Sequence, residues 1–206
     1  MADCCQDKSC EIEALREKQG TVLKVVLVIN AAMFIVESAA GIIAGSTALL
    51  ADSLDMLGDA LVYGFSLYVL GRGIKWQARS ALLKGVIMAG SGLFVLGEVV
   101  YKVLYPALPS AAIIGWIGLL ALGMNALCLG LLWRHRTDDI NMHSVWLCSR
   151  NDIIANVSVL AAGLGVWLTN TGWPDIAVGL VIAAVFFKSA VFVIIRALGH
   201  INEKPA

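Results

Sequence analysis

Three aspartates stand in an otherwise apolar stretch of the sequence, on what would be one face of a helix. Asp52, Asp55 and Asp59 are spaced i, i+3, i+7, which places them in one helical stripe. Asp55 and Asp59 are one turn apart, so both carboxylates can reach the same cation. Three acids on one face repel each other in a low dielectric unless protons or a metal neutralise them. The spacing therefore favours Asp55 and Asp59 as metal ligands, with Asp52 in a supporting role.

A second polar stripe lies in a later apolar stretch. Cys148, Asp152 and Asn156 recur at i, i+4, i+8, again on one helical face. If the two helices run antiparallel across a membrane, Asp59 and Asp152 fall at similar depth. Docking the stripes would then gather four candidate ligands around one ion: Asp55, Asp59, Cys148 and Asp152.

The chemistry of these four groups selects among metals. Oxygen and sulfur ligands in a set of four suit tetrahedral zinc, and a thiolate also favours cadmium or other soft ions. Magnesium and calcium prefer six or more oxygens. Two alternatives remain open: Cys148 could be a small packing residue, and Asp152 could form an ion pair with Arg150 or Lys188.

Other polar residues are weaker candidates for the same chemistry. Glu37 and Asn30 are seven residues apart and could line the same path, and His143 lies near the start of the second stretch. Glu98, Asn125 and Lys188 fit hydrogen bonding between membrane helices, and Asp175 fits a charge at the start of its own helix. Three tail thiols could converge on one thiophilic ion or could be idle and reduced: Cys4, Cys5 and Cys10.

Composition indicates that these residues belong to a membrane protein. The chain has 206 residues, of which 59% are hydrophobic and 15% are charged, whereas soluble domains carry about 45–50% apolar and about 25% charged residues. Its 15 basic and 15 acidic residues cancel, which argues against a nucleic-acid partner. The acidic N-terminal stretch does not resemble a cleavable signal peptide.

Six segments are long and apolar enough to cross a bilayer, which takes about 20 residues. We therefore expect an all-α membrane protein with six transmembrane helices. The expected spans are 22–44, 47–70, 81–104, 111–133, 143–168 and 174–198.

Basic residues at alternate ends of these spans predict the orientation, because positively charged loops stay in the cytoplasm. Both termini are therefore expected to face the cytoplasm. The protein itself is expected in the inner cell membrane. We expect a cysteine-containing tail over 1–20, a transport domain over 21–199 and a short tail over 200–206, with no room for a soluble C-terminal domain. Of the basic residues near the connections, only Lys102 lies on the opposite side. The basic residues on the cytoplasmic side are Lys8, Arg16, Lys18, Lys24, Arg72, Lys75, Arg79, Arg134, Arg136, Arg196 and Lys204.

Three motifs resemble those of the cation diffusion facilitator family. The run from Gly45 to Asp59 resembles the second-helix signature of the family, Ser149–Asp152 with Asn156 resembles the fifth-helix signature, and Trp173–Asp175 resembles the start of helix six. The resemblance covers the whole six-helix portion. It implies a secondary transporter rather than an enzyme, which exports zinc or related divalent metals such as cadmium or cobalt in exchange for protons, as a homodimer.

The resemblance also implies a ligand set, with Asp55 and Asp59 from the second helix and Cys148 and Asp152 from the fifth. Cys148 departs from the family, which usually has histidine or aspartate there, so a softer metal or a three-carboxylate site is implied. The usual cytoplasmic C-terminal domain is not found, so dimer contacts would come from the membrane helices. The family's long histidine-rich loop is replaced by Arg134–Asn141.

Two functions from other classes compete with transport of a metal. An intramembrane metal-dependent hydrolase would need an open coordination position and an aimed nucleophile or base, and the chain has no HExxH pattern. A small organic-cation/proton antiporter would use the acids as counter-ions and would need aromatic residues beside them. Tyr63, Phe65 and Tyr68 lie a turn or more beyond Asp59. Divalent-metal transport is therefore the function that the sequence favours.

Overall fold

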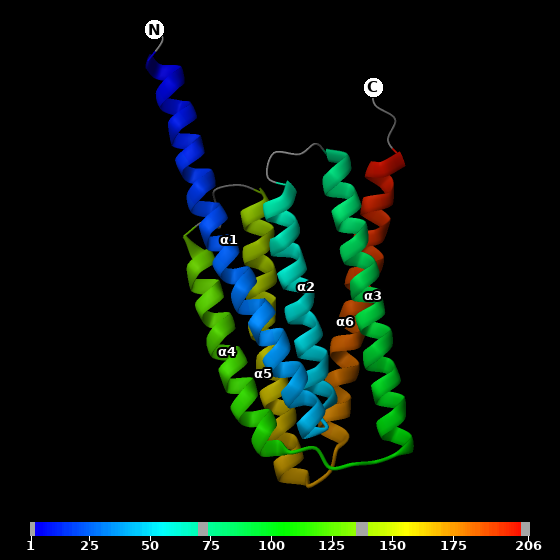
Figure 1. The fold of residues 1–206 in the computed structure, drawn as a ribbon. Coiled ribbons are helices and arrows are strands. Elements are labelled where there is room, and N and C mark those ends of the chain that lie inside the picture. The colour runs from blue at the N-terminus through cyan, green and yellow to red at the C-terminus, as the bar shows by residue number, and fades with distance from the viewer. Residues whose placement is uncertain (1–2, 70–73, 135–139, 203–206) are drawn as a thin grey trace.

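Six long helices run side by side in alternating directions (Figure 1). The structure is a computed structural model that describes residues 3–69, 74–134 and 140–202. Within these ranges α1 begins and α6 ends at the same end of the bundle, as expected for an even number of helices. The helices are α1 (Asp3–Ala44), α2 (Thr47–Val69), α3 (Ile74–Leu104), α4 (Ala111–Trp133), α5 (Ile140–Thr169) and α6 (Trp173–Asn202).

The helices match the expected spans at most of their ends and extend beyond several of them. The helix over 111–133 agrees at both ends, and α2 begins at Thr47 as expected. In contrast, α1 continues back to Asp3, α3 to Ile74 and α5 to Ile140. The apolar length of a segment reflects the thickness of the hydrocarbon core, whereas a helix can continue through polar sequence outside it.

Five of the described helices are long and apolar enough to cross a membrane, and α2 is not among them. The qualifying stretches are Gly20–Ala44, Gly85–Leu104, Ala111–Trp133, Asp152–Thr169 and Trp173–Phe192. Any stretch of α2 long enough to span contains Asp52, Asp55 and Asp59, and these acids lower its hydropathy. Whether α2 can lie in lipid therefore depends on what surrounds it.

α2 is the most enclosed helix in the described bundle. The helices associate most extensively as the pairs α1–α2, α3–α6 and α4–α5, and α2 also packs against α3, α5 and α6. The side chains of Asp52 and Asp59 are only 1% and 5% exposed. The acidic stripe thus faces protein, which removes the cost of presenting carboxylates to hydrocarbon.

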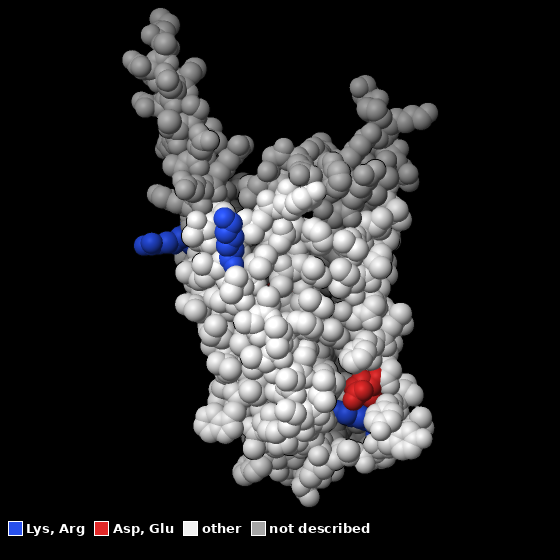
Figure 2. Space-filling model, in the orientation of Figure 1, with Lys and Arg blue, Asp and Glu red and all other residues white. Residues whose placement is uncertain are grey.

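The outer surface of the bundle is apolar. Large hydrophobic side chains on several helices are exposed, including Ile35, Leu93, Trp116, Trp167 and Ile195. On the face seen in Figure 2, the charged side chains among the described residues lie toward the two ends, and the surface between them carries none. Such an apolar band between charged ends is what a lipid-facing surface requires.

Two larger apolar clusters fill the described interior at different heights, and a smaller one of Met33, Met56 and Ala121 lies between them along α1 and α2. One joins the ends of helices near the α1–α2 turn, and includes Ala48, Leu49, Val159 and Phe186. The other lies further along α2 and includes Leu23, Val26, Tyr63, Cys128 and Leu132. On α1, α2 and α5 the buried acids lie in sequence between the residues that build these two clusters, so a polar layer is sealed by apolar packing on both sides.

Candidate metal site

The polar layer begins with the stripe on α2. Asp59 is held in place by Tyr63, whose hydroxyl donates a hydrogen bond to Asp59 Oδ2 at 2.7 Å. The two residues are one turn apart, so they share a face. Asp55 is partly buried on the same stripe. Sequence reasoning did not assign Tyr63 this role, although its i+4 spacing from Asp59 was a usable signal.

The facing stripe lies on α5, which packs against α2. Asp152 is 7% exposed, and the amide of Asn156 donates to the backbone carbonyl of Asp152 at 2.8 Å. Within the described part of the chain, Asn156 Oδ1 has no hydrogen-bond partner although the residue is fully buried. The Arg150 guanidinium lies 5.6 Å from the centre of the Trp146 ring, a cation–π distance.

Glu37 brings a fifth acid into the layer from α1, in addition to the three aspartates of α2 and Asp152 of α5. Its carboxyl group interacts with that of Asp52, and the charge of Asp55 acts on both. Glu37 is fully buried, and neither of its carboxylate oxygens has a hydrogen-bond partner among the described residues. Burying an ion without a partner is very unfavourable, so these neighbouring acids call for a cation or protons. The structure thus groups Glu37 with the acids of α2. The sequence had placed Glu37 only along a possible path for the ion.

Cys128 of α4 also borders the layer, and sequence reasoning missed it. Its sulfur accepts a hydrogen bond from the amide of Asn30 at 3.9 Å, and the charge of Asp59 acts on it. The Asn30 amide also donates to the Val26 carbonyl at 2.9 Å. Cys128 stands alone in an apolar run of the sequence, so no spacing pattern indicated it as a candidate.

The structure describes only some of the predicted metal ligands. Among the side chains that the structure describes, no group of three or more His, Cys, Asp or Glu residues could hold a metal ion. Five sequence candidates have side chains outside the described residues: Cys4, Cys5, Cys10, His143 and Cys148. The four-ligand site therefore stays a prediction, with Asp55, Asp59 and Asp152 placed on packed helices.

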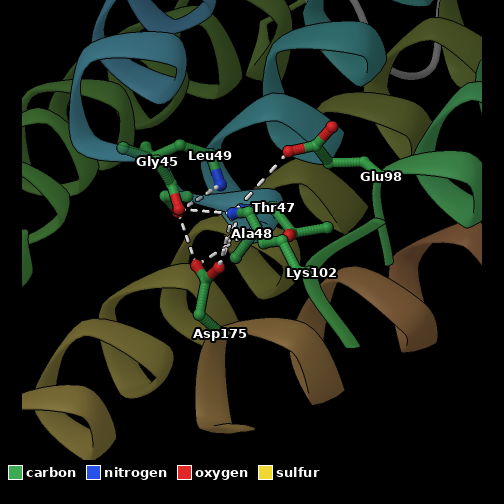
Figure 3. A network of polar contacts seen from close by, with 8 residues as sticks. Gly45, Thr47, Ala48, Leu49, Glu98, Lys102 and Asp175 are labelled. Carbon is green, nitrogen blue, oxygen red and sulfur yellow. Dashed lines mark hydrogen bonds and ion pairs between the residues drawn. The ribbon is translucent and has the colours of Figure 1, made fainter. Parts of the chain in front are cut away.

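A separate polar network closes the end of the bundle at the α1–α2 turn (Figure 3). Gly45 adopts a φ of 59°, a left-handed conformation that glycine tolerates. Lys102 of α3 donates a hydrogen bond to the Gly45 carbonyl, and its Nζ lies 3.6 Å from Asp175 Oδ2 and 3.9 Å from Glu98 Oε1. Glu98, predicted to bond between helices, thus pairs with a residue of its own helix.

Asp175 is the centre of this network. It lies in the first turn of α6, as predicted, but it also binds the start of α2. Its Oδ2 accepts from the Thr47 N–H at 2.7 Å, and its Oδ1 accepts from the Ala48 N–H at 3.2 Å and from the Ser46 hydroxyl at 2.5 Å. The Ser46 oxygen in turn accepts from the Leu49 N–H at 3.1 Å. The carboxylate of one helix therefore caps another.

The fold and these sites define a multi-pass membrane protein with acids sheltered in its core, which is the architecture of an ion transporter. Residues 23–201 match the family model of the cation efflux transmembrane domain. The match covers most of the chain, so the protein belongs to the cation efflux family, which confirms the resemblance to the cation diffusion facilitators. The family consists of transporters of divalent metal cations rather than enzymes. No curated protein sequence matches the chain.

Proposed function

We propose that the protein exports zinc, and with it cadmium, cobalt or similar divalent ions, by exchange for protons. The ion would be held by Asp55 and Asp59 of α2 and by Cys148 and Asp152 of α5. The observation that carries this proposal is the burial of acids from two packed helices in one layer between two apolar clusters. Ionised acids in a buried layer are costly unless a cation or protons neutralise them.

The exchange follows from competition for the same atoms. Metal ligands must be deprotonated, so binding of the metal releases protons and protonation releases the metal. With the layer open to the cytoplasm, the carboxylates and the Cys148 thiol would lose protons to an arriving ion. After the helices rock to open the other end, protons entering from outside would displace it. Transporters of this kind hold their ion near the membrane midplane.

In the proposed topology the chain crosses the membrane six times, and both of its termini face the cytoplasm. α2 becomes a sixth span because its acids face α1 and α5 rather than lipid, and the basic residues of the connecting segments set the orientation. The layer then lies within an inner cell membrane. We also propose that two copies associate through their membrane helices, as the resemblance to the family implies.

Transport by purified protein in lipid vesicles tests the function. With the vesicle interior acidic, we expect zinc and cadmium to accumulate inside, because outward-moving protons drive the exchange. Collapsing the pH gradient with a protonophore should stop accumulation. Vesicles without protein report the leak. Accumulation that is equal with and without a pH gradient would contradict the exchange, and absence of any metal flux would contradict the function.

The identity of the residue at 148 should set the preference between metals. Cys148→Asp replaces a soft sulfur by a hard oxygen, so we expect cadmium transport to fall relative to zinc transport. The measurement is the ratio of initial rates for the two metals in the same vesicle preparation. A Cys148→Ser variant, of nearly the same size, separates loss of sulfur from added charge. An unchanged ratio in Cys148→Asp would make Cys148 a packing residue.

A further inference from the structure

The first turn of α2 is capped by a side chain from another helix. α4 is capped locally, by Ser110, whose side chain accepts from the Ile113 N–H three residues later. α2 has its own Ser46, but two of its free N–H groups, those of Thr47 and Ala48, bind the carboxylate of Asp175 from α6. Hydrogen bonds from an ionised acceptor are about twice as strong as neutral ones, and a negative charge suits a helix N-terminus.

A second contact fixes the same end of α2 against the same helix. Gly179 lies one turn after Asp175, on the same face of α6. A Cβ atom at Gly179 would lie 2.6 Å from Thr47 Cγ2 and 3.4 Å from the Thr47 carbonyl carbon. The backbones of the two helices therefore approach closely at Thr47. A hydrogen-bonded anchor and a close packing contact, one turn apart, together define the depth and the rotation of α2 at this end.

This end of α2 is mechanically connected to the candidate ligands. α2 is one continuous helix with no proline in its sequence. Asp55 and Asp59 lie about 12 and 18 Å along the axis from Thr47, at about 1.5 Å per residue. A shift or rotation of the first turn would therefore be carried to both carboxylates. Sites that bind metal tolerate little displacement of their ligands.

We infer that Asp175 is a positioning residue for the α2 half of the metal site. By capping α2 from α6, it sets where Asp55 and Asp59 face α5, and Lys102 links α3 to the same anchor. Asp175 itself does not touch the ion. The inference rests on the proposed function insofar as Asp55 and Asp59 are ligands.

The test compares zinc affinity with stability in purified protein. Asp175→Asn keeps the size of the side chain but puts an N–H₂ donor beside the N–H donors of α2. We expect it to raise the Kd for zinc, measured by calorimetry with zinc chloride, by about tenfold, the low end of the range for groups that orient metal ligands. Glu98→Gln is the matched control: it removes another carboxylate near Lys102 without touching α2, and should leave the Kd unchanged.

The readouts separate positioning from simple stabilisation. If Asp175 only stabilises the fold, Asp175→Asn lowers the Tm and leaves the Kd of the folded protein unchanged, which overturns the inference. Gly179→Ala keeps the charge and pushes on Thr47, so it should raise the Kd as well; it decides the matter if Asp175→Asn does not fold, and an unchanged Kd there also overturns the inference. A wild-type protein that binds no zinc contradicts the proposed function, and the inference falls with it.

Discussion

Replacing Asp59 or Asp152 by alanine is expected to abolish zinc uptake into everted membrane vesicles. Each change removes one carboxylate from the proposed set of four and leaves the remaining acids buried without their cation. Loss of a group that only orients a metal ligand lowers affinity about 10- to 100-fold, so loss of a ligand should exceed that range. The measurement is the initial rate of zinc uptake, normalised to the abundance of the protein in the membrane.

Two variants of α2 control for damage to the helix. Ser53→Ala removes a buried hydroxyl that donates a hydrogen bond to the Leu50 carbonyl of the same helix, at 2.8 Å, and should leave uptake near the wild-type rate. Tyr63→Phe removes the hydrogen bond to Asp59 while keeping the carboxylate, so it should give an intermediate rate. Wild-type uptake by Asp59→Ala or Asp152→Ala at normal abundance would sink the assignment of these ligands.

Lys102→Met is expected to be the most destabilising substitution outside the metal site. Asp175 is fully buried and Lys102 is 7% exposed in its side chain, so the change leaves a buried carboxylate without its cation. Removing one partner of a buried ion pair costs about 3–5 kcal/mol. We expect the lower end, about 3 kcal/mol, because Asp175 keeps its donors from Ser46, Thr47 and Ala48. The measurement is the free energy of unfolding in detergent.

A second substitution checks the cause of this loss. In the Lys102→Met background, Asp175→Asn removes the charge that Lys102 neutralised, so the double variant should lose less than the sum of the two single losses. Contacting residues often show such coupling. Additive losses would mean that Lys102 acts through its bond to the Gly45 carbonyl instead. Lys102→Arg, which keeps the charge, should remain close to the wild type.

Much of the helical architecture could be predicted from the sequence because a segment that crosses lipid must be long and apolar. The segment Ala111–Trp133 was predicted at both ends, since prolines precede it and arginine follows it. The start of α1 at Asp3 could not be predicted, because residues 3–19 are polar and hydropathy does not report on helices outside the membrane. The segment 47–70 was predicted as a span from its apolar length, but the three acids of α2 keep it out of the five helices that are apolar enough to cross a membrane, so a sixth span stays a prediction.

Helical geometry predicts which candidate residues share a face within one helix, and the docking of the two stripes on α2 and α5 into one metal site stays a prediction. The stripe of Asp52, Asp55 and Asp59 follows from helical geometry alone. The electrostatic influence of Asp52 on Glu37 does not, because it depends on how α1 packs against α2. For the same reason Asp175 was assigned only to its own helix, although the N–H groups that it binds lie 127 and 128 residues earlier in the chain.

The cap on α2 also constrains the order in which the protein can assemble during synthesis. The α1–α2 hairpin emerges from the ribosome long before Asp175 does, so the N–H groups of Thr47 and Ala48 first enter the membrane without their acceptor. An unsatisfied backbone group in hydrocarbon costs several kcal/mol. The α1–α2 turn should therefore stay at the membrane surface, where water can bind these N–H groups, until α6 arrives. In this protein the last of the six helices completes the folding of the second.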